Sequence, residues 1–352
     1  MTTPSRFLIV RLGALGDIVH TIPVAAALRR AFPHSRIDWL VGARHRAILD
    51  LVPVIDRRLV LDDGAEAGGG LSLLATIREL RRARYDVVLD LQGLVKSAVL
   101  ARSSGAPRVI GFSPRYLRER LARLFYREAH DPGGDGMYDT RETRHVVDVN
   151  LGLLTPLGVA AGTPEFPIEF PIDRVDSDMA RSLRDEVRGG YVLLNPGAAW
   201  PNKRWPAARF GALAAALRDR YGVMSIVVWG PGEEALAREA VAGASGSAVL
   251  APPTSIADLV ALASRATIVV SGDTGPTHIA AALGTPVVGL YGPTRPSRNG
   301  PLSPAAVTIS RDAVCACHHL RRCTRPRMCL LDIEVDEVLA AVEPRLSVRT
   351  VS

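Results

Sequence analysis

Residues 267–294, TIVVSGDTGPTHIAAALGTPVVGLYGPT, decide how the chain folds. The β-branched run TIVVS is typical of a buried strand, and it ends in a turn rich in Gly, Asp and Thr. A helix is predicted next, with Thr274 or Gly275 as its cap and Pro276 in its first turn. A second apolar run follows at 286–290. Strand, helix and strand in this order form a βαβ unit of a parallel sheet.

The same alternation extends over most of the chain. Further strands are predicted at 6–11, 36–41, 57–61, 85–91, 191–195, 225–229 and 248–250. Helices are expected between them, including 18–32 and a terminal helix at 334–345, and loops are expected at 62–70 and 128–142.

A Pro-rich stretch at 156–176 interrupts this alternation and predicts an extended linker. We therefore expect an α/β chain of two domains, residues 1–165 and 166–352, whose terminal helix could return to the first domain. The 352 residues fit two domains of roughly 150 residues each. In such sheets, ligands bind at the carboxyl ends of the strands.

The composition bounds the class of protein. Hydrophobic residues make up 47% and charged residues 22%, as in ordinary globular proteins. Arg11 and Asp17 interrupt the N-terminal apolar run, which predicts a strand and no signal peptide. No apolar run approaches the ~20 residues of a membrane helix, so we expect a cytoplasmic enzyme. The net charge of +7 favours an acidic partner. Without an RNA-binding signature, a zinc-finger spacing or a basic tail, nucleic acid is not expected.

Lysine is scarce in this chain. Only two of the 43 basic residues are lysines, Lys96 and Lys203. Arginine serves as the general cation, so a retained lysine can mark a site that needs a compact ammonium. Retention by chance explains either lysine alone equally well. Both lie in the motifs described next.

The loop after the first strand, LGALGD at 12–17, has two glycines that allow a ligand to approach closely. The helix behind it favours anions at its N-terminus. The GxxGD spacing differs from the GxGxxG dinucleotide fingerprint. Asp17 can serve as a catalytic base or as a helix cap, and the sequence leaves both roles open.

Two further strand ends carry polar clusters. At 90–97, DLQGLVKS, the simplest interpretation is that Asp90 and Gln92 are caps and that Lys96 is solvated. At 196–206, PGAAWPNKRWP, cations lie between two tryptophans where a phosphate could bind. Trp205 itself is expected to anchor the core.

The stretch SGDTGPTH at 271–278 gives the strongest indication of a ligand. The free N–H groups and the dipole of a helix start attract an anion. Asp273 could accept hydrogen bonds from sugar hydroxyls, and His278, one turn into the helix, could face the same ligand. The alternative is a well-capped helix with a partly buried histidine. The coincidence of these features favours a phosphate site.

These four stretches resemble glycosyltransferase family 9, and the similarity spans nearly the whole chain. DLQGLVKSA, followed by YLRERLARLFY at 116–126, most resembles the heptosyltransferase I branch, which adds the first heptose to Kdo–lipid A. The resemblance implies a GT-B fold, with two Rossmann-like domains whose parallel sheets face a central cleft. It places the acceptor on the N-terminal domain and the donor on the C-terminal domain. It implies inverting transfer of L-glycero-D-manno-heptose from ADP-heptose to the Kdo/heptose inner core of lipopolysaccharide.

The resemblance also assigns roles to residues. Asp17 corresponds to the general base, and Gly13, Lys96 and Arg118 to positions near the acidic acceptor. The donor-binding positions are Lys203, Glu234 (with Glu233 as its rival for the ribose), Asp273, Thr274, Gly275 and His278. The sequence departs from the pattern at Ala198 and Ala199, where hydroxyl residues often contact the pyrophosphate.

No cofactor or metal is expected, because Lys203 and the helix start at 274–278 would stabilise the leaving diphosphate without a divalent ion. Closure about the linker would exclude water. The anionic acceptor implies peripheral contact with the cytoplasmic face of the inner membrane. Three alternatives stay open: a family 9 transferase for another core position or nucleotide-sugar, a GT-B nucleotide-sugar epimerase, and a non-catalytic nucleotide-sugar-binding protein.

All four cysteines fall within 314–330, beside His318 and His319: Cys315, Cys317, Cys323 and Cys329. Their spacing is not a standard zinc spacing, and a disulfide is not expected in the cytoplasm. Reduced structural thiols are the expectation, with a metal site as the alternative.

Overall fold

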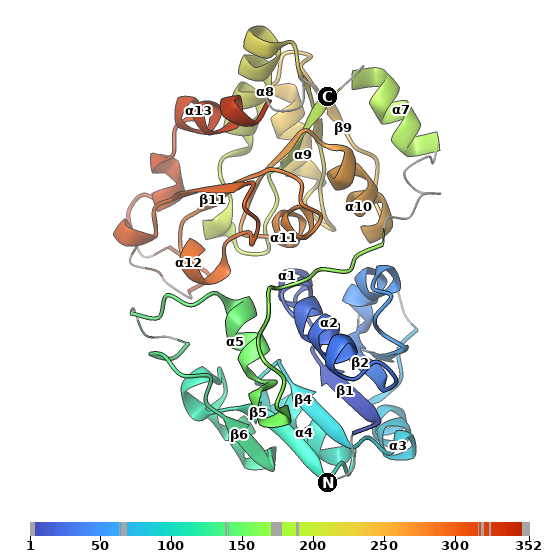
Figure 1. The fold of residues 1–352 in the computed structure, drawn as a ribbon. Helices are drawn as coiled ribbons and strands as arrows, with labels where there is room; N and C mark the ends of the chain where they lie inside the picture. The colour runs from blue at the N-terminus through green and yellow to red at the C-terminus, as the bar shows by residue number, and fades with distance from the viewer. Residues whose placement is uncertain are drawn as a thin grey trace. The chain divides into compact units, whose positions relative to one another are not determined.

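The chain divides into two compact units, Met1–Glu169 and Phe170–Ser352, which Figure 1 draws in one colour gradient. A computed structural model describes residues 4–62, 64, 69–137, 139, 141–169, 178–187, 190–315, 317, 320–323 and 325–346. Each unit holds a six-stranded sheet, and all the strand pairs in both sheets are parallel. The α/β class predicted from the sequence is confirmed.

The sheet of the first unit has the strand order β3-β2-β1-β4-β5-β6. The chain therefore steps outward from β1 in one direction and later returns to the other side of β1. The strands are β1 (Arg6–Val10), β2 (Arg36–Gly42), β3 (Arg57–Leu61), β4 (Val87–Asp90), β5 (Arg108–Phe112) and β6 (Glu128–His130).

The sheet of the second unit has the order β12-β11-β10-β7-β8-β9, which is the same topology repeated. Its strands are β7 (Tyr191–Asn195), β8 (Met224–Val227), β9 (Ala248–Leu250), β10 (Ile268–Gly272), β11 (Val287–Tyr291) and β12 (Ala306–Ser310). This doubly wound order defines a Rossmann-like unit. The two Rossmann-like domains expected from the sequence are thus confirmed.

The helices of each unit form two groups, as a sheet covered on both faces requires. In the first unit α2 contacts α5, and α3 contacts α4; in the second, α8 contacts α9 and α13, and α10 contacts α7 and α11. The helices are α1 (Leu15–Val19), α2 (Ile22–Ala31), α3 (Leu73–Ala83), α4 (Val95–Ser103), α5 (Val146–Gly152), α7 (Asp178–Val187), α8 (Ala207–Tyr221), α9 (Glu234–Ala242), α10 (Ile256–Arg265), α11 (Gly275–Ala282), α12 (Pro296–Asn299) and α13 (Val335–Leu346).

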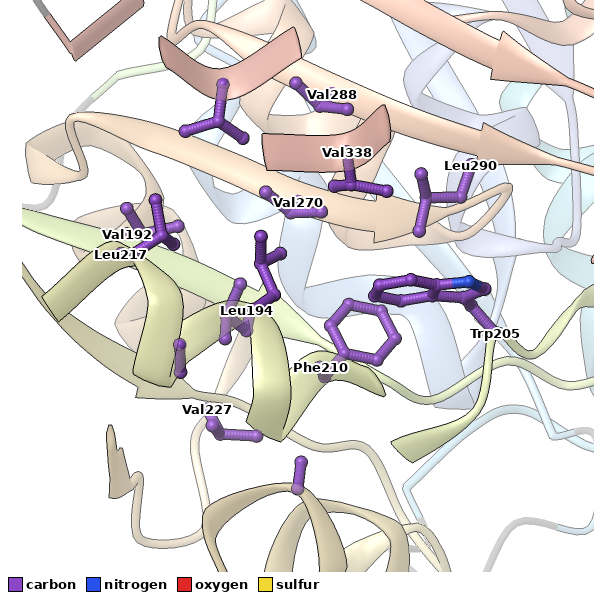
Figure 2. Close-up of a cluster of buried hydrophobic side chains, with 14 of the residues drawn as sticks. Val192, Leu194, Trp205, Phe210, Leu217, Val227, Val270, Val288, Leu290 and Val338 are labelled. Atoms are coloured by element: carbon purple, nitrogen blue, oxygen red, sulfur yellow. The ribbon is translucent and has the colours of Figure 1, made fainter. Parts of the chain in front are cut away.

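The core of the second unit lies between its sheet and the helices α8 and α13 (Figure 2). Strand residues such as Val192 and Val270 face Phe210 and Val338 across this layer. Trp205 is 2% exposed, and its indole N–H donates to the Ile333 carbonyl at 2.9 Å. It is therefore the core anchor that the sequence predicted.

Helix α13 packs against α8, β10 and β11. The sequence had left open a return of this terminal helix to the first domain, but these contacts all lie within the second unit.

Several sequence expectations need correction. The predicted loop at 128–142 begins with strand β6, and the pattern also missed β5 and β12. The single helix expected at 18–32 is two helices, α1 and α2. Most of the loop at 62–70 and the end of the linker at 156–176 lie outside the described residues.

Candidate functional site

In each sheet, the order in which the chain adds strands reverses at one pair of neighbouring strands. This pair is β1 and β4 in the first unit and β7 and β10 in the second. At such a switch point, the connections after the two strands run to opposite sides and leave a crevice that binds ligands. In register, Val10 pairs with Asp90 and Asn195 with Ser271, so the two loops of each pair start side by side. The four sequence motifs follow these four strands, two motifs at each switch point.

The switch point of the second unit brings three ionisable side chains together. Lys203, at the end of the 3₁₀ helix η5 (Pro201–Lys203), lies 2.5 Å from Asp273 Oδ2 through its Nζ atom. His278 Nε2 lies 3.1 Å from the other carboxylate oxygen, Oδ1. These side chains are only 16%, 9% and 4% exposed in the order Lys203, Asp273 and His278. Asp273 thus joins two potential cations in a nearly closed setting.

The electrostatics of this cluster keep Asp273 ionised. Burial alone would raise its pKa, but the hydrogen bond from His278 and the charge of Lys203 outweigh burial. The pKa of Asp273 therefore lies well below its ordinary value. A fixed carboxylate of this kind can hold the Lys203 ammonium in one position before a ligand arrives.

A network of neutral polar groups supports the start of helix α11. Asn195 Nδ2 donates to Ser271 Oγ at 3.0 Å and to Thr274 Oγ1 at 3.2 Å. Thr274 is the residue before the helix, and Pro276 occupies its first turn, as the sequence predicted. The sequence missed the role of Asn195, whose signal was a polar residue ending an apolar strand. This amide ties the ends of β7 and β10 together.

Close packing brings the Lys203 loop onto the Asp273 loop. A Cβ atom added to Gly272 would lie 2.9 Å from the Lys203 carbonyl oxygen, so only glycine fits there. On the other side, Lys203 Nζ lies 4.5 Å from the centre of the Trp200 ring, where the π face attracts a cation. Arg204 donates to the Ala198 carbonyl at 2.8 Å, and its guanidinium lies 3.9 Å from the Glu233 carboxylate. Of the two neighbouring cations, Lys203 is therefore the one that pairs with Asp273.

The two adjacent glutamates after β8 have different surroundings. Glu234 is 45% exposed and pairs along the helix surface with Arg238 at 2.5 Å. Glu233 is 17% exposed and accepts from the Gly230 N–H at 3.2 Å. Its carboxylate also fills the space where Gly197 would carry a Cβ atom. Glu233, the alternative to Glu234 in the sequence analysis, is thus the glutamate that packs on the 196–203 loop.

The switch point of the first unit is built around Asp17. Its Oδ2 atom lies 2.8 Å from Arg11 Nη2 and the side chain is 36% exposed. The same oxygen accepts from the Ala14 N–H at 3.2 Å, immediately before helix α1. The carboxylate therefore caps the helix from its third position. Both contacts use Oδ2 and leave Oδ1 for another partner, so Asp17 can cap the helix and still act as a base.

Gln92 links the two loops at this switch point. Its Oε1 atom accepts from the Leu12 N–H at 2.9 Å and from the Gly13 N–H at 3.3 Å. The interpretation of Gln92 as a cap was therefore wrong. A Cβ atom on Gly13 would lie 2.8 Å from the His45 ring, so glycine allows this close approach.

Asp90 is structural, as expected. It is fully buried and accepts from the Gln92 N–H at 2.9 Å, Ser97 Oγ at 2.9 Å and Tyr126 Oη at 2.8 Å. Burial raises its pKa despite these donors. Its oxygens are fully used in shaping the turn before α4.

Lys96 and Arg118 are both exposed, and a backbone contact holds their segments together. Glu119 accepts from the Val95 N–H at 2.7 Å, which joins the start of α4 to the 3₁₀ helix η3 (Arg120–Phe125). In the described part of the chain, neither cation has an ion-pair partner. The two can therefore bind an anion from solution.

The two sites differ in what they can do chemically. The second unit presents a fixed ammonium, a helix start and a buried carboxylate, which suit a phosphorylated ligand. The first unit presents a half-exposed carboxylate that can accept a proton. Among the described helices, none has both the length and the apolar character required to cross a membrane.

Residues 73–328 match the sequence profile of glycosyltransferase family 9 (heptosyltransferase). This match covers most of the chain, which belongs to glycosyltransferase family 9 and is a glycosyltransferase. The lipopolysaccharide heptosyltransferase 1 of Pseudomonas aeruginosa is 32% identical over 91% of this chain and 87% of its own length. The protein of the same name from Escherichia coli K12 is 30% identical over 84% of this chain and 90% of its own length.

Solved structures share the fold. A family 9 glycosyltransferase from Veillonella parvula gives a TM-score of 0.79 at 24% identity, covering 97% of each chain. An Escherichia coli heptosyltransferase with ADP gives 0.74 at 24% identity, covering 97% of this chain and 99% of the other. Escherichia coli ADP-heptose lipopolysaccharide heptosyltransferase II gives 0.77 at 21% identity, covering 98% and 99%. The GT-B type of fold, expected from the resemblance, is confirmed.

Proposed function

We propose that this glycosyltransferase moves L-glycero-D-manno-heptose from ADP-heptose onto the Kdo/heptose inner core of lipopolysaccharide. The observation that carries the proposal is the pair of unlike switch points in a chain related to lipopolysaccharide heptosyltransferases. One unit carries the nearly buried cluster of Lys203, Asp273 and His278, and the other the partly exposed carboxylate of Asp17. Glycosyl transfer from a nucleotide-sugar needs both functions.

On the donor side, Lys203 and the N–H groups at the start of α11 would bind the diphosphate of ADP-heptose. Gly275 opens that helix and presents its backbone without a side chain. Asp273 would hold Lys203 and His278 in position, and Thr274 would complete the loop. For the ribose, Glu233 is the better candidate than Glu234, because Glu233 packs on the 196–203 loop, whereas Glu234 pairs with Arg238 on the exposed surface of the helix.

On the acceptor side, Asp17 would be the general base. It takes the proton from the acceptor hydroxyl while that oxygen attacks the anomeric carbon of the heptose. The bond to the ADP oxygen breaks on the opposite face, so the anomeric configuration inverts. ADP leaves with the electron pair of that bond, and Lys203 with the α11 start stabilises its charge. No divalent ion enters this scheme.

Gly13, Lys96 and Arg118 would contact the acidic acceptor. Next to Arg118, the side chains of Leu121 and Leu124 on η3 are 67% and 76% exposed. Exposed leucines beside arginines suit a bilayer with anionic lipids, because the apolar groups enter the interface and the cations meet the headgroups. We therefore place the enzyme at the cytoplasmic face of the inner membrane.

The test is a transfer assay with ADP-heptose, with and without Kdo–lipid A. We expect ADP release and a heptosylated product only when the acceptor is present. Conversion of the donor without acceptor would instead indicate the epimerase alternative. Donor binding with no reaction under either condition would indicate the non-catalytic alternative.

The nucleotide is tested separately by thermal unfolding. ADP at 100 times its dissociation constant should stabilise the protein by ~2.7 kcal/mol. UDP and CMP should give no comparable shift. Equal shifts with UDP would contradict an ADP-linked donor.

A further inference from the structure

The four cysteines form a cluster that the proposed transfer reaction does not use. Cys315, Cys317 and Cys329 are 5%, 0% and 1% exposed, and Cys323 packs against them. All four are free thiols, and among the residues that the structure describes the cluster consists of cysteines alone. We propose that this cluster is a closed structural site for one thiophilic divalent metal ion, with zinc as the natural occupant.

The sulfur positions support four ligands to one ion. Cys315 Sγ and Cys317 Sγ lie 3.1 Å apart. Cys329 belongs to the same buried cluster, and Cys323 packs against it. The four thiols therefore lie in one cluster, although their positions span 15 residues of chain.

The thiols are packed against one another, and the S–S separation between Cys315 and Cys317 is shorter than in a metal-bound site. Sulfurs bound tetrahedrally to zinc at ~2.3 Å stand about 3.8 Å apart, and the Cys315–Cys317 separation is shorter. Among the described residues, no group of three or more His, Cys, Asp or Glu side chains is placed so that it could hold a metal ion, so the sulfurs must move apart for an ion to enter. For the Cys315–Cys317 pair, that movement is less than about 1 Å.

The surrounding segment has little else to stabilise it. Between β12 and α13 the described residues form only two short 3₁₀ turns, η6 (Asp312–Val314) and η7 (Cys329–Asp332). A core made of four small sulfur side chains buries little apolar area, whereas metal coordination contributes folding free energy directly.

The charge also fits. Binding exchanges four S–H bonds for four S–metal bonds and releases the four protons to solvent, which leaves a net charge of −2 on the site. The same segment carries four arginines: Arg321, Arg322, Arg325 and Arg327. Arg325 and Arg327 pair with Asp332, so Arg321 and Arg322 would mainly offset that charge.

The cluster has a polar neighbour on the loop that carries Lys203. Asn202 is 2% exposed; its Nδ2 atom lies 3.6 Å from Cys317 Sγ and donates to the Leu320 carbonyl at 2.9 Å. N–H donors to sulfur are a usual outer shell of thiolate metal sites. The metal would therefore fix the base of the 196–203 loop as well as its own segment.

The first test is the metal content of the full-length, tag-free protein, purified under reducing conditions without chelators from cells supplied with zinc and iron. We expect about one equivalent of zinc per chain. Cobalt added to the reduced, demetallated protein should give intense thiolate-to-cobalt absorption and the d–d bands of a tetrahedral ion. Since the chain has only four cysteines, such bands can come only from this cluster.

The second test compares Cys317→Ser and Cys329→Ser with the wild type. Each should lose the zinc or most of its affinity and should weaken the cobalt bands. If a variant does not fold, the wild-type zinc content and cobalt spectrum still decide. A wild type without metal and without cobalt bands would overturn the proposal. So would one equivalent of zinc that both folded variants retain, or stoichiometric iron in place of zinc.

Discussion

The two switch points share one topology but differ in how their charges are held. In the second unit, Lys203, Asp273 and His278 form a nearly buried cluster. In the first unit, Asp17 is 36% exposed and is held by one arginine and one backbone N–H. A buried cluster is fixed before its ligand arrives, whereas an exposed carboxylate is available for proton transfer. The difference is what our proposal of donor binding at one switch point and proton transfer at the other requires.

The largest effect is expected from Asp17→Asn, which removes the proposed base from the first unit. Asparagine keeps an oxygen that can accept from the Ala14 N–H but loses the charge that pairs with Arg11, so the melting temperature should fall less than in a variant that removes both contacts. Turnover should fall by roughly 10²–10⁴, which is the contribution of a general base. Steady-state kinetics with ADP-heptose and acceptor provide the measurement. Near-normal turnover in this variant would end the assignment of Asp17 as the base.

Asp17→Ala is the companion variant, because it removes the cap as well. If Asp17 acts only as a cap, this protein should melt earlier and keep its activity per folded molecule. A loss of turnover in both variants, with the larger fall in melting temperature in the alanine variant, would separate the two roles.

In the second unit, Asp273→Asn should mainly affect stability. It leaves the Lys203 charge buried without its partner, which costs about 3–5 kcal/mol. Denaturant unfolding measures this loss, and Glu234→Gln is the matched control. The Glu234–Arg238 pair is exposed, so its removal should cost well under 1 kcal/mol. Equal stabilities of the two variants would show that the buried cluster is not held as described.

The same cluster predicts a pH dependence. The folded-state pKa of Asp273 is lowered, so the unfolded chain binds more protons in the acid range. The stabilisation by this carboxylate is complete above the unfolded pKa of about 3.9 and is lost as the pH falls from there toward the lowered pKa. The difference in unfolding free energy between the wild type and Asp273→Asn should therefore become smaller as the pH falls into the acid range. An unchanged difference from neutral pH down to strong acid would contradict this origin of the effect.

Lys203→Gln should weaken donor binding. Losing a charged hydrogen bond of ~1.5–3 kcal/mol raises the dissociation constant of ADP roughly 10- to 150-fold. Lys96→Gln is the matched control, because it removes the other lysine of the chain and lies on the first unit. The dissociation constants are measured by calorimetric titration at a low temperature, at which both variants should be folded. A similar loss of ADP affinity in the two variants would contradict the proposal that ADP binds at the switch point of the second unit.

The smallest expected effect distinguishes the two glutamates. Glu233→Gln should weaken ADP about 2- to 10-fold, as the loss of one hydrogen bond of ~0.5–1.5 kcal/mol predicts. Glu234→Gln should leave ADP binding unchanged, because its partner is Arg238. The reverse ranking in a titration would restore Glu234 as the ribose contact.

The sequence predicted the parts of the fold that follow from periodicity. Strong apolar runs such as β1 and β10 were found, while β6 was missed because three residues of mixed polarity carry no period. The positions of the four motifs were also predictable, since each follows a strand.

Pair contacts across loops were not predictable. Nothing in the local pattern shows that Gln92 reaches the Leu12 and Gly13 N–H groups or that Asn195 reaches Thr274. Nor does it show which of two adjacent glutamates turns inward. These contacts depend on register between distant strands, which one sequence does not encode in local spacing.

The central claim is tested most directly by the affinity of Asp17→Asn for ADP, measured by calorimetric titration beside the wild type. If binding and chemistry belong to different switch points, the dissociation constant should match that of the wild type although turnover has collapsed. An ADP affinity that falls in step with turnover would contradict the account.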